Sequence, residues 1–76
     1  MNADQISHGT PAAFREHIHE AVSRAAIQAE IAMQYAELGD DAGLEYAILH
    51  LVAYTKTALA TVADLKAMNE KEASHG

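Results

Sequence analysis

The stretch AELGDDAGL, residues 36–44, separates two long alanine-rich segments and decides how the chain folds. Gly39 suits the left-handed residue that closes a helix, and Asp40 or Asp41 suits the cap of the next one. A connection this short places consecutive helices side by side in opposite directions. The stretch therefore predicts an antiparallel two-helix hairpin.

The segment before this turn carries a helix start signal at Thr10 and Pro11. Threonine can cap the free amides, and proline is preorganised for the first helical position. No further proline or glycine occurs between Pro11 and Gly39, which predicts a helix over residues 11–38. Residues 1–9 show no apolar periodicity and are predicted to form a flexible arm. The second helix is expected over about 41–70, followed by a frayed tail at 71–76.

The apolar spacing within both helices predicts how they pack. In the first helix, steps of 4 and 3 residues connect Ile18, Val22, Ala25, Ala29, Ala32 and Ala36. In the second helix, the same steps connect Leu44, Ile48, Leu51, Thr55, Ala58, Val62 and Leu65. Alternation of 4 and 3 is the spacing of one helix packed along another. These positions are expected to form the seam inside the hairpin.

Further apolar residues lie outside this seam, namely Ile27, Ile31, Leu38, Leu49, Val52 and Leu59. A lone hairpin would leave them in water, and contiguous exposed apolar surface normally marks an interface. A chain of 76 residues without cysteine also has few other means of stabilising a small core. The expected fold class is all-α, an antiparallel two-helix hairpin that dimerises into a four-helix bundle.

The charge balance excludes several classes of partner. Asp and Glu outnumber Lys and Arg by 11 to 5, and the basic residues are well spread along the chain. Nucleic-acid phosphates and anionic lipid surfaces attract clustered basic residues, so neither partner is expected. No apolar run is long enough to cross a bilayer, and the first residues do not resemble a signal peptide. We expect a soluble cytoplasmic protein.

A short polar segment suggests a metal site. Glu16 and His19 form Glu-x-x-His, the spacing by which ferritin-like bundles offer a carboxylate and an imidazole to iron. In an antiparallel hairpin, Asp64 would lie near their level. The alternative is an ordinary solvated helix face, because the heptad count turns Glu16 away from the core. No cofactor is predicted.

The turn region offers a candidate surface for a protein partner. Acidic residues gather there, at Glu37, Asp40, Asp41 and Glu45. The same surface is expected to include Ile27, Ile31, His50 and Tyr54. The alternatives are helix capping and solvation for the acidic residues, and a hydrogen-bonded position within a helix interface for His50.

No catalytic or phosphate-binding motif occurs in the sequence, so no enzymatic activity is predicted. The sequence favours a small acidic interaction module that associates with itself and docks on a larger protein as accessory subunit, regulator or inhibitor. Two alternatives stay open. One is a metal-binding bundle, and the other is a purely structural oligomerisation unit.

Overall fold

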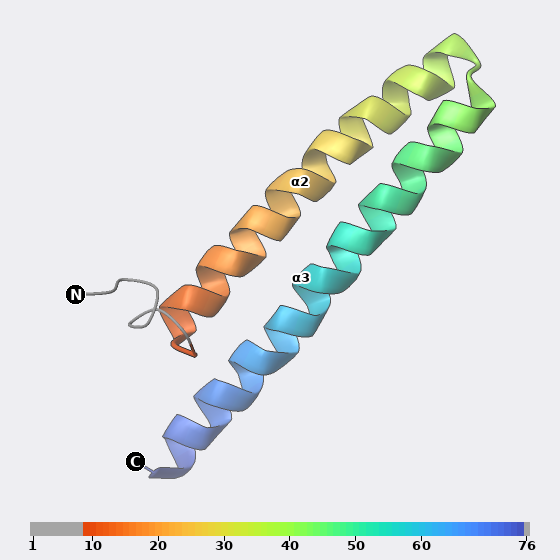
Figure 1. The fold of residues 1–76 in the computed structure, drawn as a ribbon. Helices are drawn as coiled ribbons and strands as arrows, with labels where there is room; N and C mark the ends of the chain where they lie inside the picture. Colours follow the sequence, from red (N-terminus) through yellow and green to blue (C-terminus); the bar gives the residue numbers. More distant parts are fainter. Residues whose placement is uncertain (1–8, 76) are drawn as a thin grey trace.

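The computed structural model describes residues 9–75, with side chains from 9 to 71. Two helices, α2 (Pro11–Leu38) and α3 (Asp41–His75), pack against each other in opposite directions. Figure 1 shows the resulting rod, with the turn at one end and the start of α2 and the end of α3 toward the other. It measures 54 × 29 × 13 Å. The all-α hairpin is confirmed, while all of the expected N-terminal arm except Gly9 lies outside the described residues.

Both ends of α2 are held by its own capping groups. The Thr10 hydroxyl accepts a hydrogen bond from the Ala13 amide at 3.1 Å, and Pro11 occupies the first helical position. At the other end, Gly39 is left-handed, with φ 72° and ψ 21°. Its amide donates to the Ala36 carbonyl at 3.2 Å. These ends coincide with the ends that the sequence predicts.

The start of α3 is capped by Asp40, whose carboxylate accepts from the Gly43 amide at 2.9 Å. Asp41 follows in the first turn, where negative charge is favourable. The helix continues to His75, whereas the sequence reading ended it at about residue 70 with a frayed tail. No glycine or proline occurs between Gly43 and Gly76, so nothing local ends the helix at residue 70.

The most buried residues between the two helices have small side chains, and larger side chains beside them are half-buried. These most buried residues, each at most 8% exposed, are Ala21, Ala25, Ala32, Ala47, Ala58 and Thr61. With half-buried neighbours they form the alanine seam, which steps by 3 and 4 along Phe14, Ile18, Ala21, Ala25, Gln28, Ala32 and Tyr35 of α2 and Leu44, Ala47, Leu51, Tyr54, Ala58, Thr61, Leu65 and Met68 of α3. Small side chains allow the helix axes to lie close together.

The predicted seam is right at the positions that recur every seven residues, and of the six predicted members between them only Ala29 is half-buried. Five predicted members are exposed instead, namely Val22, Ala36, Ile48, Thr55 and Val62. The sequence fits two heptad patterns, the predicted seam and the observed one. Both contain the residues that recur every seven positions, and they differ by one residue at the position between. At Ala21, Ala47 and Thr61 the hairpin uses the smaller of the two candidate residues, and Val22, Ile48 and Val62 are turned outward. At Gln28, Tyr35 and Tyr54 it uses the larger one.

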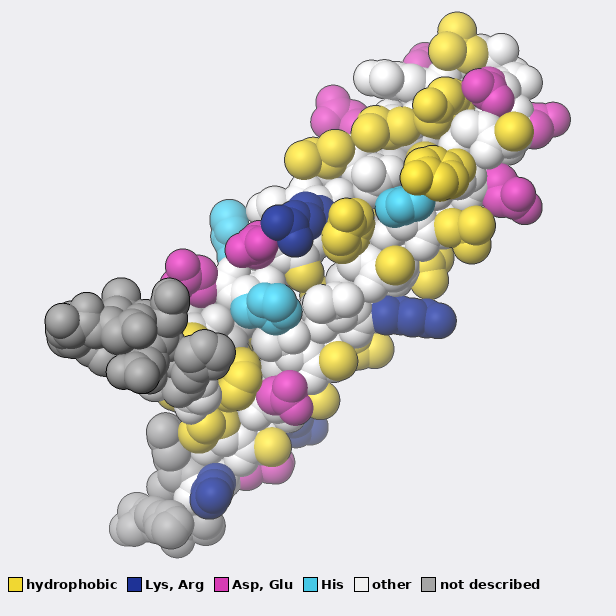
Figure 2. Space-filling model, in the orientation of Figure 1, with side chains coloured by type: hydrophobic (Ala, Val, Ile, Leu, Met, Phe, Trp, Pro, Cys, Tyr) yellow, Lys and Arg dark blue, Asp and Glu magenta, His cyan; other side chains and the backbone are white. Residues whose placement is uncertain are grey.

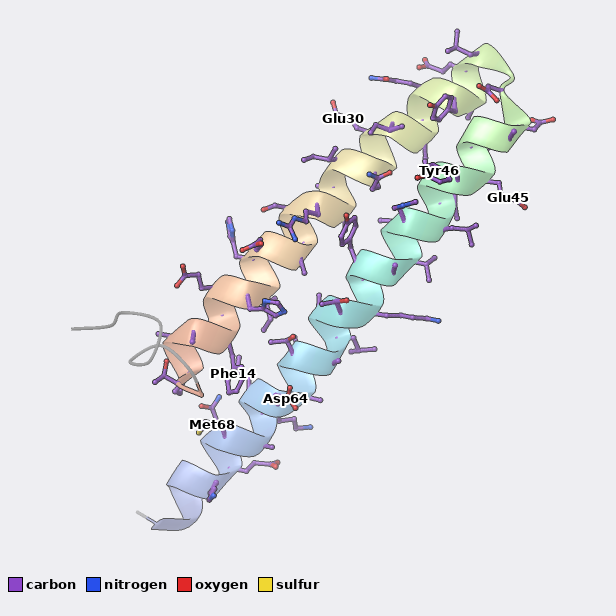
Figure 3. All side chains as sticks on the ribbon, in the orientation of Figure 1. Phe14, Glu30, Glu45, Tyr46, Asp64 and Met68 are labelled. Atoms are coloured by element: carbon purple, nitrogen blue, oxygen red, sulfur yellow. The ribbon has the colours of Figure 1, made fainter. Side chains whose placement is uncertain are left out.

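One close contact fixes the register of the hairpin near the turn. A Cβ atom added to Gly43 would lie 2.5 Å from Cδ1 and 2.6 Å from Cε1 of Tyr35. The Tyr35 ring therefore packs directly on the Gly43 backbone. About one helical turn away, the register set by Tyr35 and Gly43 places Ala32 and Ala47 at nearly the same level, and both are buried. At the open end, Phe14 lies near Asp64 and Met68 of α3 (Figure 3).

Gly43→Ala is expected to destabilise the protein by on the order of 1 kcal/mol because the Tyr35 ring must move away. In a Tyr35→Ala background the same change is expected to stabilise it by about 0.5–1 kcal/mol, the ordinary gain of alanine over glycine in a helix. Urea unfolding of the four variants at one protein concentration measures both effects. An equal effect of Gly43→Ala in the two backgrounds would contradict the proposed contact.

Candidate interaction surface

A second row of apolar residues runs along the outside of each helix, next to the alanine seam. We call the two rows together the long strip, which consists of Val22, Ala26, Ala29, Met33 and Ala36 of α2 and Ile48, Val52, Thr55, Leu59 and Val62 of α3. Both rows alternate steps of 4 and 3, the spacing for packing along another helix. The large hydrophobic side chains of the strip are between 41% and 69% exposed.

Both rows of the long strip lie on one face of the hairpin. Val22, Ile48 and Val62 each directly follow a seam residue, namely Ala21, Ala47 and Thr61. In an antiparallel pair, an approximate two-fold axis perpendicular to the plane of the helices relates one helix to the other. This axis keeps equivalent heptad positions on the same face. The rows therefore form one continuous surface centred near the middle of the rod.

The opposite face differs between its two halves. Toward the open end it carries polar groups, including the exposed Glu20–Arg24 ion pair at 2.8 Å. Toward the turn it carries a second apolar cluster, which we call the turn-end patch: Ile27, Ile31, Leu38, Tyr46 and His50. Figure 2 shows hydrophobic side chains near the turn, edged by Asp and Glu, while Lys and Arg side chains lie further along the rod.

The half of the rod near the turn and the half near the open end also differ in charge. Residues 27–52 contain no Lys or Arg and five carboxylates, namely Glu30, Glu37, Asp40, Asp41 and Glu45. Residues 9–26 and 53–71 contain five basic side chains, Arg15, Arg24, Lys56, Lys66 and Lys71, against four acidic ones, Glu16, Glu20, Asp64 and Glu70. The turn half therefore has a net charge of −5, and the open half is nearly neutral at +1, with histidines neutral.

The hairpin exposes more surface than a compact protein of its size. The chain of 8.1 kDa has an accessible surface of 5705 Å². The size relation for compact monomers gives about 4500 Å², so the hairpin exposes roughly 1200 Å² more. A typical stable interface buries about 800 Å² per partner. The excess is therefore sufficient for a protein–protein interface.

His50 and Tyr46 are held together within the turn-end patch. The Nδ1 atom of His50 lies 2.9 Å from the Tyr46 carbonyl oxygen. Because a carbonyl can only accept, Nδ1 carries the proton, and Nε2 remains available to a partner. The two rings also pack at a centroid distance of 4.2 Å. This contact arranges an aromatic surface beside a hydrogen-bonding nitrogen.

The partner-binding residues predicted from the sequence fall in two different environments. Ile27, Ile31 and His50 lie together in the turn-end patch, and the predicted acidic residues surround the turn. Tyr54 instead belongs to the alanine seam and is half-buried. Figure 3 shows Glu30 on the outer side of α2 and Glu45 on the outer side of α3.

The predicted metal ligands Glu16, His19 and Asp64 are all exposed. By heptad position, His19 lies on the long-strip face and Asp64 on the opposite face. Within the described part of the chain, no three His, Asp or Glu side chains lie close enough to hold a metal ion. A metal centre stays a prediction that would require ligands from a second chain, and metal analysis of the purified protein tests it.

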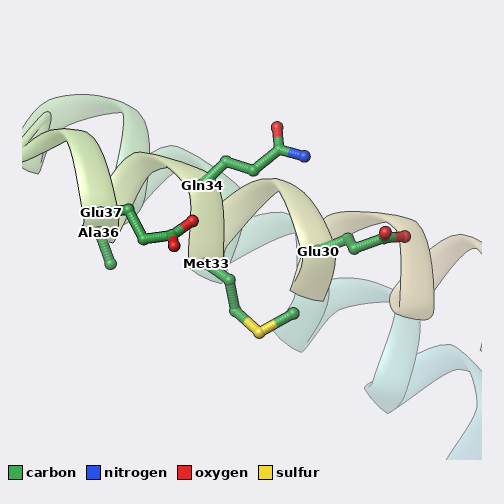
Figure 4. A pocket seen from close by; sticks show the side chains of 5 residues that line it. All are labelled: Glu30, Met33, Gln34, Ala36 and Glu37. Carbon is green, nitrogen blue, oxygen red and sulfur yellow. The ribbon is translucent and has the colours of Figure 1, made fainter.

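Three surface hollows of the described residues each lie along a single helix. One is lined by Glu30, Met33, Gln34, Ala36 and Glu37, all from successive turns of α2 (Figure 4). Another is lined by Lys56, Leu59, Ala60, Val62, Ala63 and Lys66 of α3. The second includes Leu59 and Val62 of the long strip, so it suits an apolar side chain of another helix.

The sequence reading missed the long strip as a single surface, because it placed Ile48 and Val62 inside the hairpin. The alanines at positions 21, 25, 32, 47 and 58 could have revealed the close seam, since they recur at heptad spacing in both helices.

Neither helix of the described residues contains a stretch long and apolar enough to cross a bilayer. The chain matches no protein-family model, no curated protein sequence and no solved structure.

Proposed function

We propose that this protein is a non-catalytic interaction module in which two copies pair through the long strip as a four-helix bundle. The observation that carries the proposal is the long strip itself, an apolar surface with heptad spacing on both helices of one face. Pairing two strips covers the side chains that the hairpin leaves in water. The remaining surface of the dimer is then available to a larger protein, as an accessory subunit or regulator requires.

Charge favours one orientation of the two copies. If both turns lay at the same end, two acidic halves of net charge −5 would lie side by side. If the turn of each copy lies beside the open end of the other, each acidic half meets a nearly neutral one with basic side chains. Repulsion between like charges is then smaller. The central position of the strip lets a two-fold axis pair it with itself in this orientation.

Native mass spectrometry at micromolar concentration tests the dimer, and a spin label tests its orientation. The chain has no cysteine, so Ala42→Cys attaches one label to each turn. Turns at opposite ends should place the two labels about 40 Å apart, the length of a 28-residue helix. Turns at the same end would give roughly 20 Å. A monomeric mass would overturn the dimer, and the short distance would overturn its orientation.

The same orientation bears on the metal alternative. With turns at opposite ends, the Glu16 and His19 side chains of the two copies lie at opposite ends of the bundle. They then cannot combine into one site. The dimer proposal and a shared Glu16/His19 centre therefore exclude each other.

A further inference from the structure

We propose that the turn-end patch binds a basic amphipathic helix of a partner protein. This inference deepens the proposed interaction module by assigning its second surface and the chemistry of what docks there. The patch lies on the face opposite the long strip, so it stays accessible when two copies pair. Each dimer would therefore carry two such sites, one on each copy.

The apolar part of the site is a shallow surface built by both helices. Ile27 is 56% exposed, Leu38 78% and Tyr46 65%, and Ile31 is half-exposed between them. The patch occupies one end of the rod and spans successive turns of α2. A helix that lays an apolar row into such a surface contacts it through residues at spacings of 3 and 4. The exposed length suits a few turns of helix.

The charge around the patch selects the partner. The turn half carries five carboxylates without any Lys or Arg, so an acidic or neutral segment would leave this charge unbalanced. Lysine or arginine residues flanking an apolar row would balance it, as in other complexes of acidic grooves with basic helices. A second copy of the turn half is excluded as occupant by the same charge. A bare lipid surface is disfavoured because its headgroups are neutral or anionic.

The probe that tests the site is a synthetic 18-residue helix made only of leucine and lysine, with leucine at helical spacing. Fluorescence anisotropy of the labelled peptide measures its binding to the full chain. We expect micromolar binding that weakens as salt rises, because charges contribute to it. The double variant Ile31→Ser/Tyr46→Ser changes no charge and is expected to bind at least about 10-fold more weakly. The matched control is Ala60→Ser/Ala67→Ser, two exposed positions of α3 beyond the patch, and it should bind like the unchanged protein.

Several outcomes would overturn the proposal. Equal binding by the patch variant and the control would mean that charge alone attracts the peptide. Loss of binding only in a variant of the long strip would assign the peptide to that surface. A smaller oligomer for Ile31→Ser/Tyr46→Ser would assign the patch to self-association. Undetectable binding up to about 100 μM would exclude a site even of weak affinity.

The test distinguishes this inference from the proposed dimer. Sedimentation of each sample reports whether the chain is a dimer, independently of the peptide. A monomer that still binds the peptide through Ile31 and Tyr46 would support the peptide site and contradict the proposed dimer. A dimer that does not bind the peptide would support the dimer and contradict the peptide site.

Discussion

Replacing Val52 and Leu59 with lysine is expected to weaken association of the two copies by at least about 1000-fold. The two side chains are 42% and 69% exposed in the hairpin, so changing them leaves the alanine seam intact. Burying an aliphatic side chain of this size contributes about 1.5–3 kcal/mol. A two-fold interface loses each contribution twice, and the new charges face each other across it.

Sedimentation velocity over a range of concentrations measures this effect. The matched control is Ala53→Lys/Ala67→Lys, which adds the same charge to the same helix at exposed positions outside the long strip. The control should sediment like the unchanged protein. If Val52→Lys/Leu59→Lys sediments as a dimer of unchanged affinity, the long strip is not the interface.

Enlarging the most buried alanine should destabilise the hairpin itself. Ala47 is 1% exposed and lies opposite Ala32, which is 5% exposed. Ala47→Leu adds three carbon atoms where the two backbones approach closely. Overpacking of this kind typically costs about 1–3 kcal/mol, and we expect about 3 kcal/mol because Ala47 is the most buried residue of the seam.

Thermal and urea unfolding followed by circular dichroism measure the cost. Ala53→Leu serves as the control, since position 53 lies on the same helix and is exposed. It should change the free energy of unfolding by less than about 0.5 kcal/mol. Equal stabilities for the two variants would mean that the helices separate without cost, and the alanine seam would then not determine their distance.

The local signals in the sequence were sufficient to predict the hairpin. Thr10 with Pro11 and Gly39 with Asp40 act through hydrogen bonds to backbone groups within a few residues, so no knowledge of distant contacts is needed. The end of α3 was placed too early, because helix propensity declines gradually there and no residue stops the helix before Gly76.

The spacing of apolar residues does not show which face of each helix lies inside the hairpin. Ile48 and Ala47 fit the heptad equally well, and hydrophobicity alone favours the larger one. At this position the close approach of the two helices favours the smaller side chain instead. That approach depends on both helices together, so the spacing within one helix does not reveal it. Tyr54 is larger than Thr55 and still lies in the seam, so side-chain size alone does not select the pattern, while Ile27, Ile31 and His50 lie outside the seam in either pattern.

The alanine seam also bears on how long a single copy survives in a cell. The most buried residues of the seam are alanines and one threonine, which bury little apolar area, and its larger side chains are only half-buried. The seam therefore contributes only a modest part of the free energy that opposes the loss of chain entropy. A separated hairpin would therefore open readily and present both helices to proteases. Any copy made in excess of its binding partners would be removed, and the amount of assembled protein would follow the supply of chains with which it can pair.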